Sequence, residues 1–597
     1  MNTSLKRVVG IALLGSLGVA ACQPQVVEVE KQVVVTKEVQ VETEVEVEKI
    51  VEVEKIVEVE KEVEVEKVVE VEKIVEVEVQ AEADKTLVYV SPTTPISLDR
   101  CVIPGQQTAE IIQNTSWFWT TYTYVNGPDG LTMADTAGGE DAIQPWKPGD
   151  AHQPGVLEAW ESNEDGSVWT LTIRKGVLDE LGREMKAADF VWNWDKTIQM
   201  GPCSYISNGI NLKSTDQIEV IDDYTVKMDL GAPNPIFLRV LHVNNGMAIA
   251  PSVQDYDTPD DPWAGDWLKT NVVALGPYRI DAFVPGEQVR LEKNPNWFGP
   301  EPDIDTVIYR QVPESANRVA LLMSGDAHIA RDLTQDELDE IAKVDGLTAQ
   351  CTAANQFLYA AMNHLDGPTA DVNVRQALAY ATPYQDIIES AYRGRAGAMP
   401  GFHPPTYSDY LGEDAWPYET DYDKARELLA AAGYADGFAA NIVVDSGVPE
   451  HETVAVLLQS SFAEIGVELQ IDMKPTAAHR DVAFGRTFGD MVLDQNYAIT
   501  LDPGYHAGVW LPDLEGGFNF GGFYDEEFHT TLDTGFQTAV GPERTEMMYT
   551  LQKVFNDQSV YLSLATVPTC FGMSDKVQNY VWHTHNQIVF SDLTLEE

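Results

Sequence analysis

The feature that most constrains this chain is a low-complexity tract at residues 26–79, built from valine, isoleucine, glutamate and lysine. A six-residue unit at residues 49–54 recurs at residues 55–60. A period of six fits neither a heptad coiled coil nor a solenoid repeat that buries a core. The tract holds 18 Glu and 7 Lys, so charge repulsion favours an extended spacer. Any packed core must therefore come from the residues that follow.

The conformation of the tract stays open. Valines alternate with glutamates at the period of a strand, whereas Ile50, Val53 and Ile56 recur every three residues, closer to a helix. A coiled-coil oligomerisation segment is the alternative to a spacer.

The N-terminus indicates export. Lys6 and Arg7 precede an apolar run at residues 8–17, which is well short of the ~20 residues that cross a bilayer. We expect a signal peptide at residues 1–21. Cys22 follows two alanines and resembles the acylated cysteine of bacterial lipoproteins, so we expect lipidation at Cys22 and a stalk at residues 22–83. The protein would then be extracytoplasmic, anchored to the outer face of the bacterial cell membrane; the alternative is a secreted protein with a chance cysteine.

The charge of the chain restricts its partners. The net charge of the chain is −56. Lys6 and Arg7 contribute +2 and the tract contributes −11, so residues 80–597 carry −47. So acidic a chain argues against nucleic acid or anionic lipid as a partner. With 44% hydrophobic residues, the part after the stalk is long enough for two or three domains.

Four further cysteines, Cys101, Cys203, Cys351 and Cys570, show no CxxC or zinc-ligand spacing. One or two disulfides in any of three connectivities, or four buried thiols, are compatible with the sequence.

Motifs of catalysis are missing from the sequence. His451 and Glu452 begin an HExxH-like pattern, but Ala455 stands where the second histidine would be. His583 and His585 lie two residues apart without a third ligand nearby, which favours a surface strand. There is no GxSxG, P-loop or dinucleotide fingerprint. We therefore expect no enzyme, no metal and no cofactor.

Short β-branched runs alternate with amphipathic helical patterns after residue 85, which indicates an α/β protein. We expect strands at residues 86–90, 169–173 and 224–230, and helices at residues 190–199 and 424–432 that start after Asp189 and Asp423.

Several sequence blocks occur in a characteristic order. LEAWE at residues 157–161 and DGSVWTLTIRKG at residues 165–176 resemble the signature block of the bacterial extracellular solute-binding protein family 5, which serves peptide, nickel and oligosaccharide uptake by ABC transporters. Further blocks that resemble the family follow at residues 187–192, 276–280, 293–298, 374–381, 424–434 and 466–469.

The resemblance implies an α/β, bilobed, periplasmic-binding-protein-like fold of type II with an inserted subdomain. By analogy, lobe I comprises residues 84–125, 246–354 and 561–597, the inserted subdomain residues 126–245, and lobe II residues 355–560.

The resemblance also implies a function. A monomeric receptor would capture a solute between its lobes and deliver it to the permease subunits of an ABC importer. A peptide-like solute ranks first, an oligosaccharide second and a metal chelate third. A sensory or chaperone subunit of the same fold is a further alternative.

Two segments supply candidate ligand-binding residues, because a solute cleft is lined by aromatic faces and a few polar groups. They are Trp117, Trp119 and Tyr122 in the first segment, and Asp494, Asn496, Tyr497, Ile499 and Trp510 in the second. In peptide-binding relatives an acidic residue that pairs with the α-amine stands where this chain has Ile499. An unpaired buried ammonium is costly, so the resemblance predicts poor binding of free α-amino peptides unless Asp494 takes that role.

Overall fold

The computed structural model describes residues 84–102, 106–127, 130–513 and 517–596. The predicted signal peptide, Cys22 and the stalk lie outside the described residues. No helix among the described residues combines the length and the apolar character that a membrane span requires.

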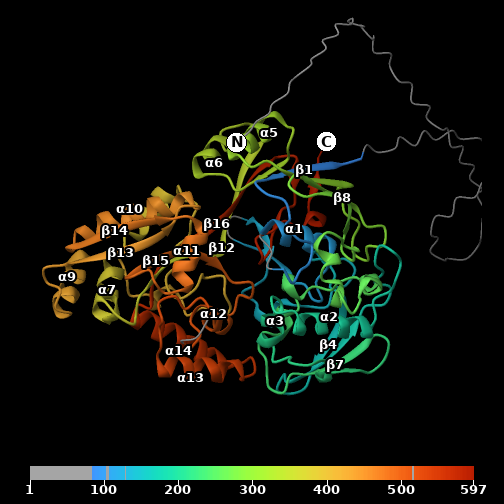
Figure 1. Ribbon diagram of the computed structural model, residues 1–597, viewed down its shortest axis with the longest axis horizontal. Helices are drawn as coiled ribbons and strands as arrows, with labels where there is room; N and C mark the ends of the chain where they lie inside the picture. The colour runs from blue at the N-terminus through green and yellow to red at the C-terminus, as the bar shows by residue number, and fades with distance from the viewer. Residues whose placement is uncertain (1–83, 103–105, 128–129, 514–516, 597) are drawn as a thin grey trace, which may run out of the picture. The chain divides into compact units, whose positions relative to one another are not determined.

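A ten-stranded mixed sheet organises residues 84–597 (Figure 1). Its strands lie in the order β14 (Val467–Lys474), β13 (Phe438–Asp445), β15 (Met491–Tyr497), β12 (Leu347–Met362), β16 (Tyr561–Ser574), β11 (Ile329–Arg331), β1 (Thr86–Ser91), β10 (Thr306–Gln311), β9 (Gln288–Lys293) and β8 (Tyr278–Val284). Strands β1 and β10 pair in parallel, as do β13 and β14, whereas β12 and β16 are antiparallel. We use lobe I for the β8 to β11 side of the sheet and lobe II for the β13 to β15 side.

Strands β12 and β16 connect the two lobes. They are the longest strands described, at 16 and 14 residues, and they pair along most of their length. The register shifts between Ala353 and Gln356, which marks a β-bulge where the strands pass from lobe I toward lobe II. A disulfide joins Cys351 to the directly opposite Cys570 on the lobe I side of this bulge.

Within the stretch predicted as the inserted subdomain lies a separate sheet, in the order β4 (Leu157–Ser162), β5 (Val168–Ile173), β7 (Thr225–Asp229) and β6 (Ile218–Val220). A three-stranded sheet has the order β18 (Val581–Trp582), β3 (Thr132–Ala134) and β2 (Tyr124–Asn126). A two-stranded sheet pairs β17 (Val577–Gln578) with β19 (Thr594–Leu595). A second disulfide, Cys101–Cys203, ties the segment before α1 to the residue preceding α3.

Helices surround these sheets. Lobe I contains α1 (Gln106–Thr115), α5 (Ser315–Ser324) and α6 (Gln335–Ile341), and the inserted subdomain contains α2 (Ala187–Gln199), α3 (Ser204–Gly209) and α4 (Phe237–Val240). Lobe II contains α7 (Val372–Tyr380), α8 (Tyr384–Asp386), α9 (Tyr422–Ala431), α10 (Pro449–Ala463), α11 (Thr476–Phe484), α12 (Pro503–Trp510), α13 (Glu526–Phe536) and α14 (Pro542–Gln558).

The three predicted strands form as β1, β5 and β7, with ends shifted by one residue or less. The predicted start residues of two helices are wrong. Asp189 lies inside the first turn of α2, and its carboxylate accepts the N–H of Lys186 at 2.7 Å. Helix α9 is capped by Asp421, which accepts the N–H of Lys424 at 2.9 Å. At α9 the neighbouring Asp421 and Asp423 compete as caps, and backbone geometry selects Asp421. At α2 the cap position belongs to Lys186, and Asp189 acts from inside the first turn.

Candidate functional site

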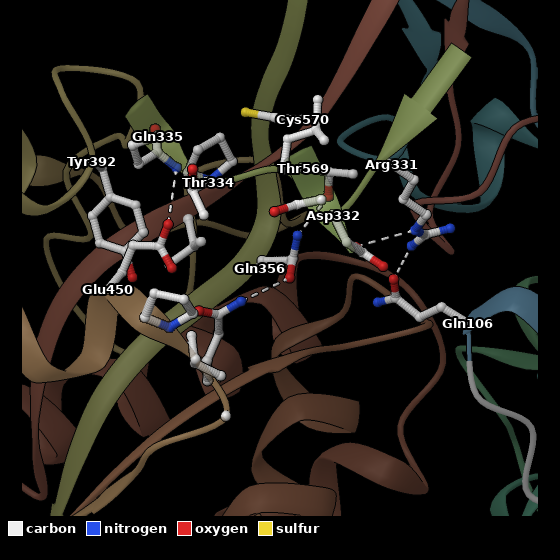
Figure 2. Close-up of a pocket in the computed structure, with 18 of the residues that line it drawn as sticks. Gln106, Arg331, Asp332, Thr334, Gln335, Gln356, Tyr392, Glu450, Thr569 and Cys570 are labelled. Atoms are coloured by element: carbon white, nitrogen blue, oxygen red, sulfur yellow. Dashed lines mark hydrogen bonds and ion pairs between the residues drawn. The ribbon is translucent and has the colours of Figure 1, made fainter. Parts of the chain in front are cut away.

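A cavity of about 630 Å³ lies between the lobes, against the two connecting strands (Figure 2). Lobe I contributes the start of α1, the residues before α5 and the segment from β11 into α6, and lobe II contributes Tyr392, the start of α10 and Gln495. Strands β12 and β16 contribute Gln356 and residues 567–570. The volume suits a small organic solute.

Side-chain amides cover the strands at one side of the cavity. Gln495 of β15 donates from Nε2 to Oε1 of Gln356 on β12 at 3.1 Å. Gln356 in turn donates to the hydroxyl of Thr569 on β16. These side chains share a face of the sheet because Gln356 lies opposite Tyr497 and Val567, and Gln495 and Thr569 are each two residues from those partners. Their mutual hydrogen bonds fix the amides in place.

Arg331 provides the lobe I wall at the end of β11. Its side chain is buried and pairs with the carboxylates of Glu110 and Asp332, each at 3.4 Å. Arg331 also donates to Oε1 of Gln106, the first residue of α1 (Figure 2). These contacts hold Gln106 and Asp332 at the edge of the cavity.

Helix α6 of lobe I contacts lobe II beside the cavity. Arg393 pairs with Asp336 at 2.6 Å, and Arg395 pairs with Asp339 at 2.5 Å. Gln335 at the start of α6 donates to Glu450 of α10 at 3.3 Å. Helix α6 begins at this point because Thr334 caps it and accepts the N–H of Glu337. The two lobes therefore touch each other directly in this conformation.

The first predicted group of ligand-binding residues lies in the core. Trp117, Trp119 and Tyr122 are almost fully buried among the apolar residues of the inserted subdomain. The indole N–H groups of Trp117 and Trp119 donate to the carbonyls of Pro154 at 2.7 Å and Gly246 at 2.8 Å. Trp117 and Tyr122 border a separate void of about 10 Å³, which is too small for a solute.

The second predicted group does not line the cavity either. Asp494 is buried and accepts hydrogen bonds from Tyr359 at 3.1 Å and from Asn496 at 3.4 Å. Burial raises the pKa of the Asp494 carboxyl. Trp510 is buried with its ring 5.2 Å from that of Phe357.

The remaining members of the second group are half-buried. Asn496 and Tyr497 end β15, and Ile499 packs against the apolar cluster of the inserted subdomain. None of the eight predicted residues is among those that line the 630 Å³ cavity; Gln495, between Asp494 and Asn496, does line it.

The residues that do line the cavity carry no motif. Gln106, Gln356, Glu450 and Gln495 come from four separate stretches of the chain. The local sequence signals mark helix starts only: Thr334 and Glu337 form the capping box of α6, and Pro449 occupies the first turn of α10. No periodicity links these positions in the sequence.

The histidines do not assemble a metal centre. His583 pairs with Asp592 at 2.8 Å, and His585 is buried, which corrects the expectation of a surface strand. Across the part of the chain that the structure describes, no group of three or more potential ligands is close enough to hold a metal ion.

Comparison with known proteins gives a consistent result. The model of the family described as bacterial extracellular solute-binding proteins, family 5 (middle part), matches residues 151–515. The glutathione-binding protein GsiB of Salmonella typhimurium is 25% identical over 421 residues, which cover 68% of this chain and 79% of GsiB. The dipeptide-binding protein of Escherichia coli is 25% identical over 485 residues, 74% of this chain and 86% of the relative.

A solved structure shares the fold. The periplasmic binding protein DppA of Helicobacter pylori, in complex with the peptide STSA, superposes with a TM-score of 0.70 at 22% identity. The alignment covers 86% of this chain and 98% of DppA.

Proposed function

Because the chain belongs to family 5 of the bacterial extracellular solute-binding proteins, which are receptors of ABC importers and not enzymes, we propose that it captures a peptide-like solute in the 630 Å³ cavity. One observation carries this proposal: lobe I, lobe II and both connecting strands contribute to the lining. A solute at this place touches all of them at once. It therefore stabilises the closed arrangement of the lobes over an open one.

The peptide-like class is supported by what the relatives are named for. One relative is named for glutathione and another for dipeptides, and the structural neighbour holds a tetrapeptide. The amide side chains of Gln106, Gln356 and Gln495 suit the amide groups of such a solute, because each offers both a donor and an acceptor.

The lobe boundaries follow the strand pairing. We place lobe I at residues 84–125, 246–354 and 561–597, the inserted subdomain at residues 126–245 and lobe II at residues 355–560. In this division β12 passes from lobe I into lobe II, whereas β16 begins at the lobe I boundary and pairs with β12 along most of its length. These two paired strands are the hinge about which the cavity opens.

We also propose that acylation of Cys22 holds the receptor at the outer face of the membrane and that the stalk spaces it from the surface. The export signal before Cys22 and the small residues around it support this arrangement. A receptor so placed remains close to its permease.

A cavity-filling substitution tests the solute site. Gln495→Trp places a large ring into the cavity from β15, and Gln470→Trp makes the same exchange at an exposed position of β14. Solutes released from the purified protein by denaturation are identified by mass spectrometry and then titrated by calorimetry.

We expect Gln495→Trp to weaken binding at least tenfold, about 1.4 kcal/mol, and Gln470→Trp to leave it unchanged. Unchanged affinity in a folded Gln495→Trp protein would mean that the solute binds elsewhere. Release of a carbohydrate or metal chelate instead of a peptide would overturn the peptide-like class while keeping the site.

A further inference from the structure

The charged groups of the cavity are unevenly available to a solute. Three carboxylates and two guanidiniums line it, namely Glu314, Asp332, Glu450, Arg318 and Arg331. Both guanidiniums are engaged within lobe I. Arg318 donates to four backbone carbonyls at 2.5–2.9 Å, and Arg331 binds Glu110, Asp332 and Gln106. Each arginine therefore already has carboxylate or carbonyl partners within lobe I.

Glu450 differs from the other two carboxylates. Glu314 and Asp332 are exposed on lobe I, whereas Glu450 is half-buried in the first turn of α10 in lobe II. Among the described residues, no salt bridge involves Glu450. Its hydrogen bond comes from the neutral amide of Gln335 at 3.3 Å.

The hydrogen bonds from Glu450 lead through Gln335 to the guanidinium of Arg395, whose charge is already neutralised. Gln335 accepts at its other end from Arg395 at 3.1 Å, and Arg395 is paired with Asp339. The α6 segment therefore presents an amide, not a cation, to the Glu450 carboxylate. A half-buried carboxylate without a counter-charge favours a cationic partner.

Tyr392 supplies a second, independent observation at the same end of the cavity (Figure 2). Its side chain is 2% exposed, and its hydroxyl has no hydrogen-bond partner. Burial and the nearby Glu450 carboxylate raise the pKa of Tyr392, so the phenol is neutral. An unmade hydrogen bond of a buried hydroxyl is unfavourable, and a polar atom of a solute beside Glu450 would complete it.

We propose that Glu450 and Tyr392 form a subsite for a cationic nitrogen of the solute, an ammonium or guanidinium group, and that Glu450 determines specificity for it. This inference rests on the solute site proposed above. The nitrogen pairs with the Glu450 carboxylate, and an adjacent polar atom of the solute hydrogen-bonds to the Tyr392 hydroxyl. The same chemistry can come from the α-amine of a peptide or from a basic side chain.

Two pairs of capped peptides separate these sources. Ala-Ala-Ala amide and N-acetyl-Ala-Ala-Ala amide differ in the α-ammonium. N-acetyl-Ala-Lys-Ala amide and N-acetyl-Ala-norleucine-Ala amide differ in the side-chain ammonium. Each peptide is titrated by calorimetry into the full chain, Glu450→Gln, Tyr392→Phe and the control Glu452→Gln, which removes an exposed charge from the same turn of α10.

In at least one pair we expect the cationic peptide to bind at least tenfold more tightly than its neutral counterpart. Glu450→Gln should reduce this ratio to within twofold, and Glu452→Gln should keep it. Tyr392→Phe should weaken the binding of both peptides of the pair. Thermal melting confirms that each variant is folded.

The inference is overturned if the unaltered protein shows no preference in either pair, including the case in which no peptide binds, or if Glu450→Gln keeps the preference. Failure of the proposed solute site gives a different pattern. In that case peptides bind, but Gln495→Trp does not lower their affinity.

Discussion

Arg239 of the inserted subdomain and Asp502 of lobe II form an ion pair at 3.5 Å, with side chains only 4% and 0% exposed. Arg239 also donates to the carbonyl of Leu501 at 3.0 Å and to the hydroxyl of Ser408 at 3.1 Å. Asp502 pairs in addition with Arg544 at 2.8 Å and caps α12 by accepting the N–H of Tyr505. One carboxylate thus neutralises two buried guanidiniums and joins two parts of the fold.

Replacing this carboxylate should destabilise the protein strongly. Asp502→Asn removes the carboxylate that Arg239 pairs with and leaves Arg544 with the more distant Asp409 at 3.7 Å, so we expect a loss of about 3–5 kcal/mol in the free energy of unfolding at pH 7. Denaturant titration measures it, and Asp533→Asn at an exposed position of α13 is the control. A loss no larger than in the control would contradict this role.

The same residue predicts a pH dependence. Burial alone would raise the pKa of Asp502, but Arg544 and Arg239 outweigh it and hold the pKa below the ordinary value. The unfolded chain then binds the proton more readily than the folded one. The stabilisation is present above the unfolded pKa of about 3.9 and is lost as the pH falls toward the folded-state value. Below about pH 4 the unaltered protein should therefore lose stability more steeply than Asp502→Asn, as followed by unfolding at stepped pH; parallel curves would refute this.

The disulfide between the connecting strands should contribute to stability. Cys351 and Cys570 close a loop of 219 residues that contains all of lobe II. Cross-linking so long a loop restricts the unfolded chain, so the double variant Cys351→Ser/Cys570→Ser should lose about 2–5 kcal/mol. Guanidinium unfolding under non-reducing conditions tests it. Equal stability of the variant and the unaltered protein would show that the bond adds nothing.

The contacts of α6 with lobe II should favour the closed form. Removing both ion pairs with Arg393→Ala/Arg395→Ala should weaken solute binding by about two- to thirtyfold, because two pairs of about 0.2–1 kcal/mol each contribute about 0.4–2 kcal/mol together. Calorimetry with the co-purified solute measures this effect, which should shrink at high salt. Arg426→Ala breaks an ion pair within α9 and serves as the matched control. If Arg426→Ala lost as much affinity as the double variant, the contacts of α6 would not be what favours the closed form.

The proposed lipid anchor depends on one atom, the sulfur of Cys22. Cys22→Ser removes the thiol that would be acylated, so the protein should leave the membrane fraction. Fractionation followed by mass spectrometry of the N-terminus tests this expectation. An acylated Cys22→Ser protein that remains in the membrane would show that the anchor lies elsewhere.

The stalk should be dispensable for binding. Deleting residues 26–79 should change the melting temperature by less than about 2 °C, because the six-residue repeat has no core-forming period. Solute affinity in solution should stay the same. A large drop in melting temperature, or the loss of an oligomer, would show that the tract packs against something.

The sequence by itself determined the class of this protein. The ordered blocks identified the family, and the β-branched runs located β1, β5 and β7, because residues adjacent in the chain decide which stretch can be a strand. Helix starts were less certain, since an acidic residue can act as the cap, as Asp421 does in α9, or from inside the first turn, as Asp189 does in α2.

Only the tertiary structure decided the site. Trp117, Trp119 and Trp510 are rich in aromatic surface, and the fold buries that surface as core. Gln106, Gln356, Glu450 and Gln495 are unremarkable in the sequence, and they meet because strands β15, β12 and β16 are neighbours and α1 and α10 begin at the same cavity. The same applies to the pairing of Arg239 with Asp502, which lie 263 positions apart. Local propensity acts over a few residues, whereas contacts between distant segments depend on how whole elements pack.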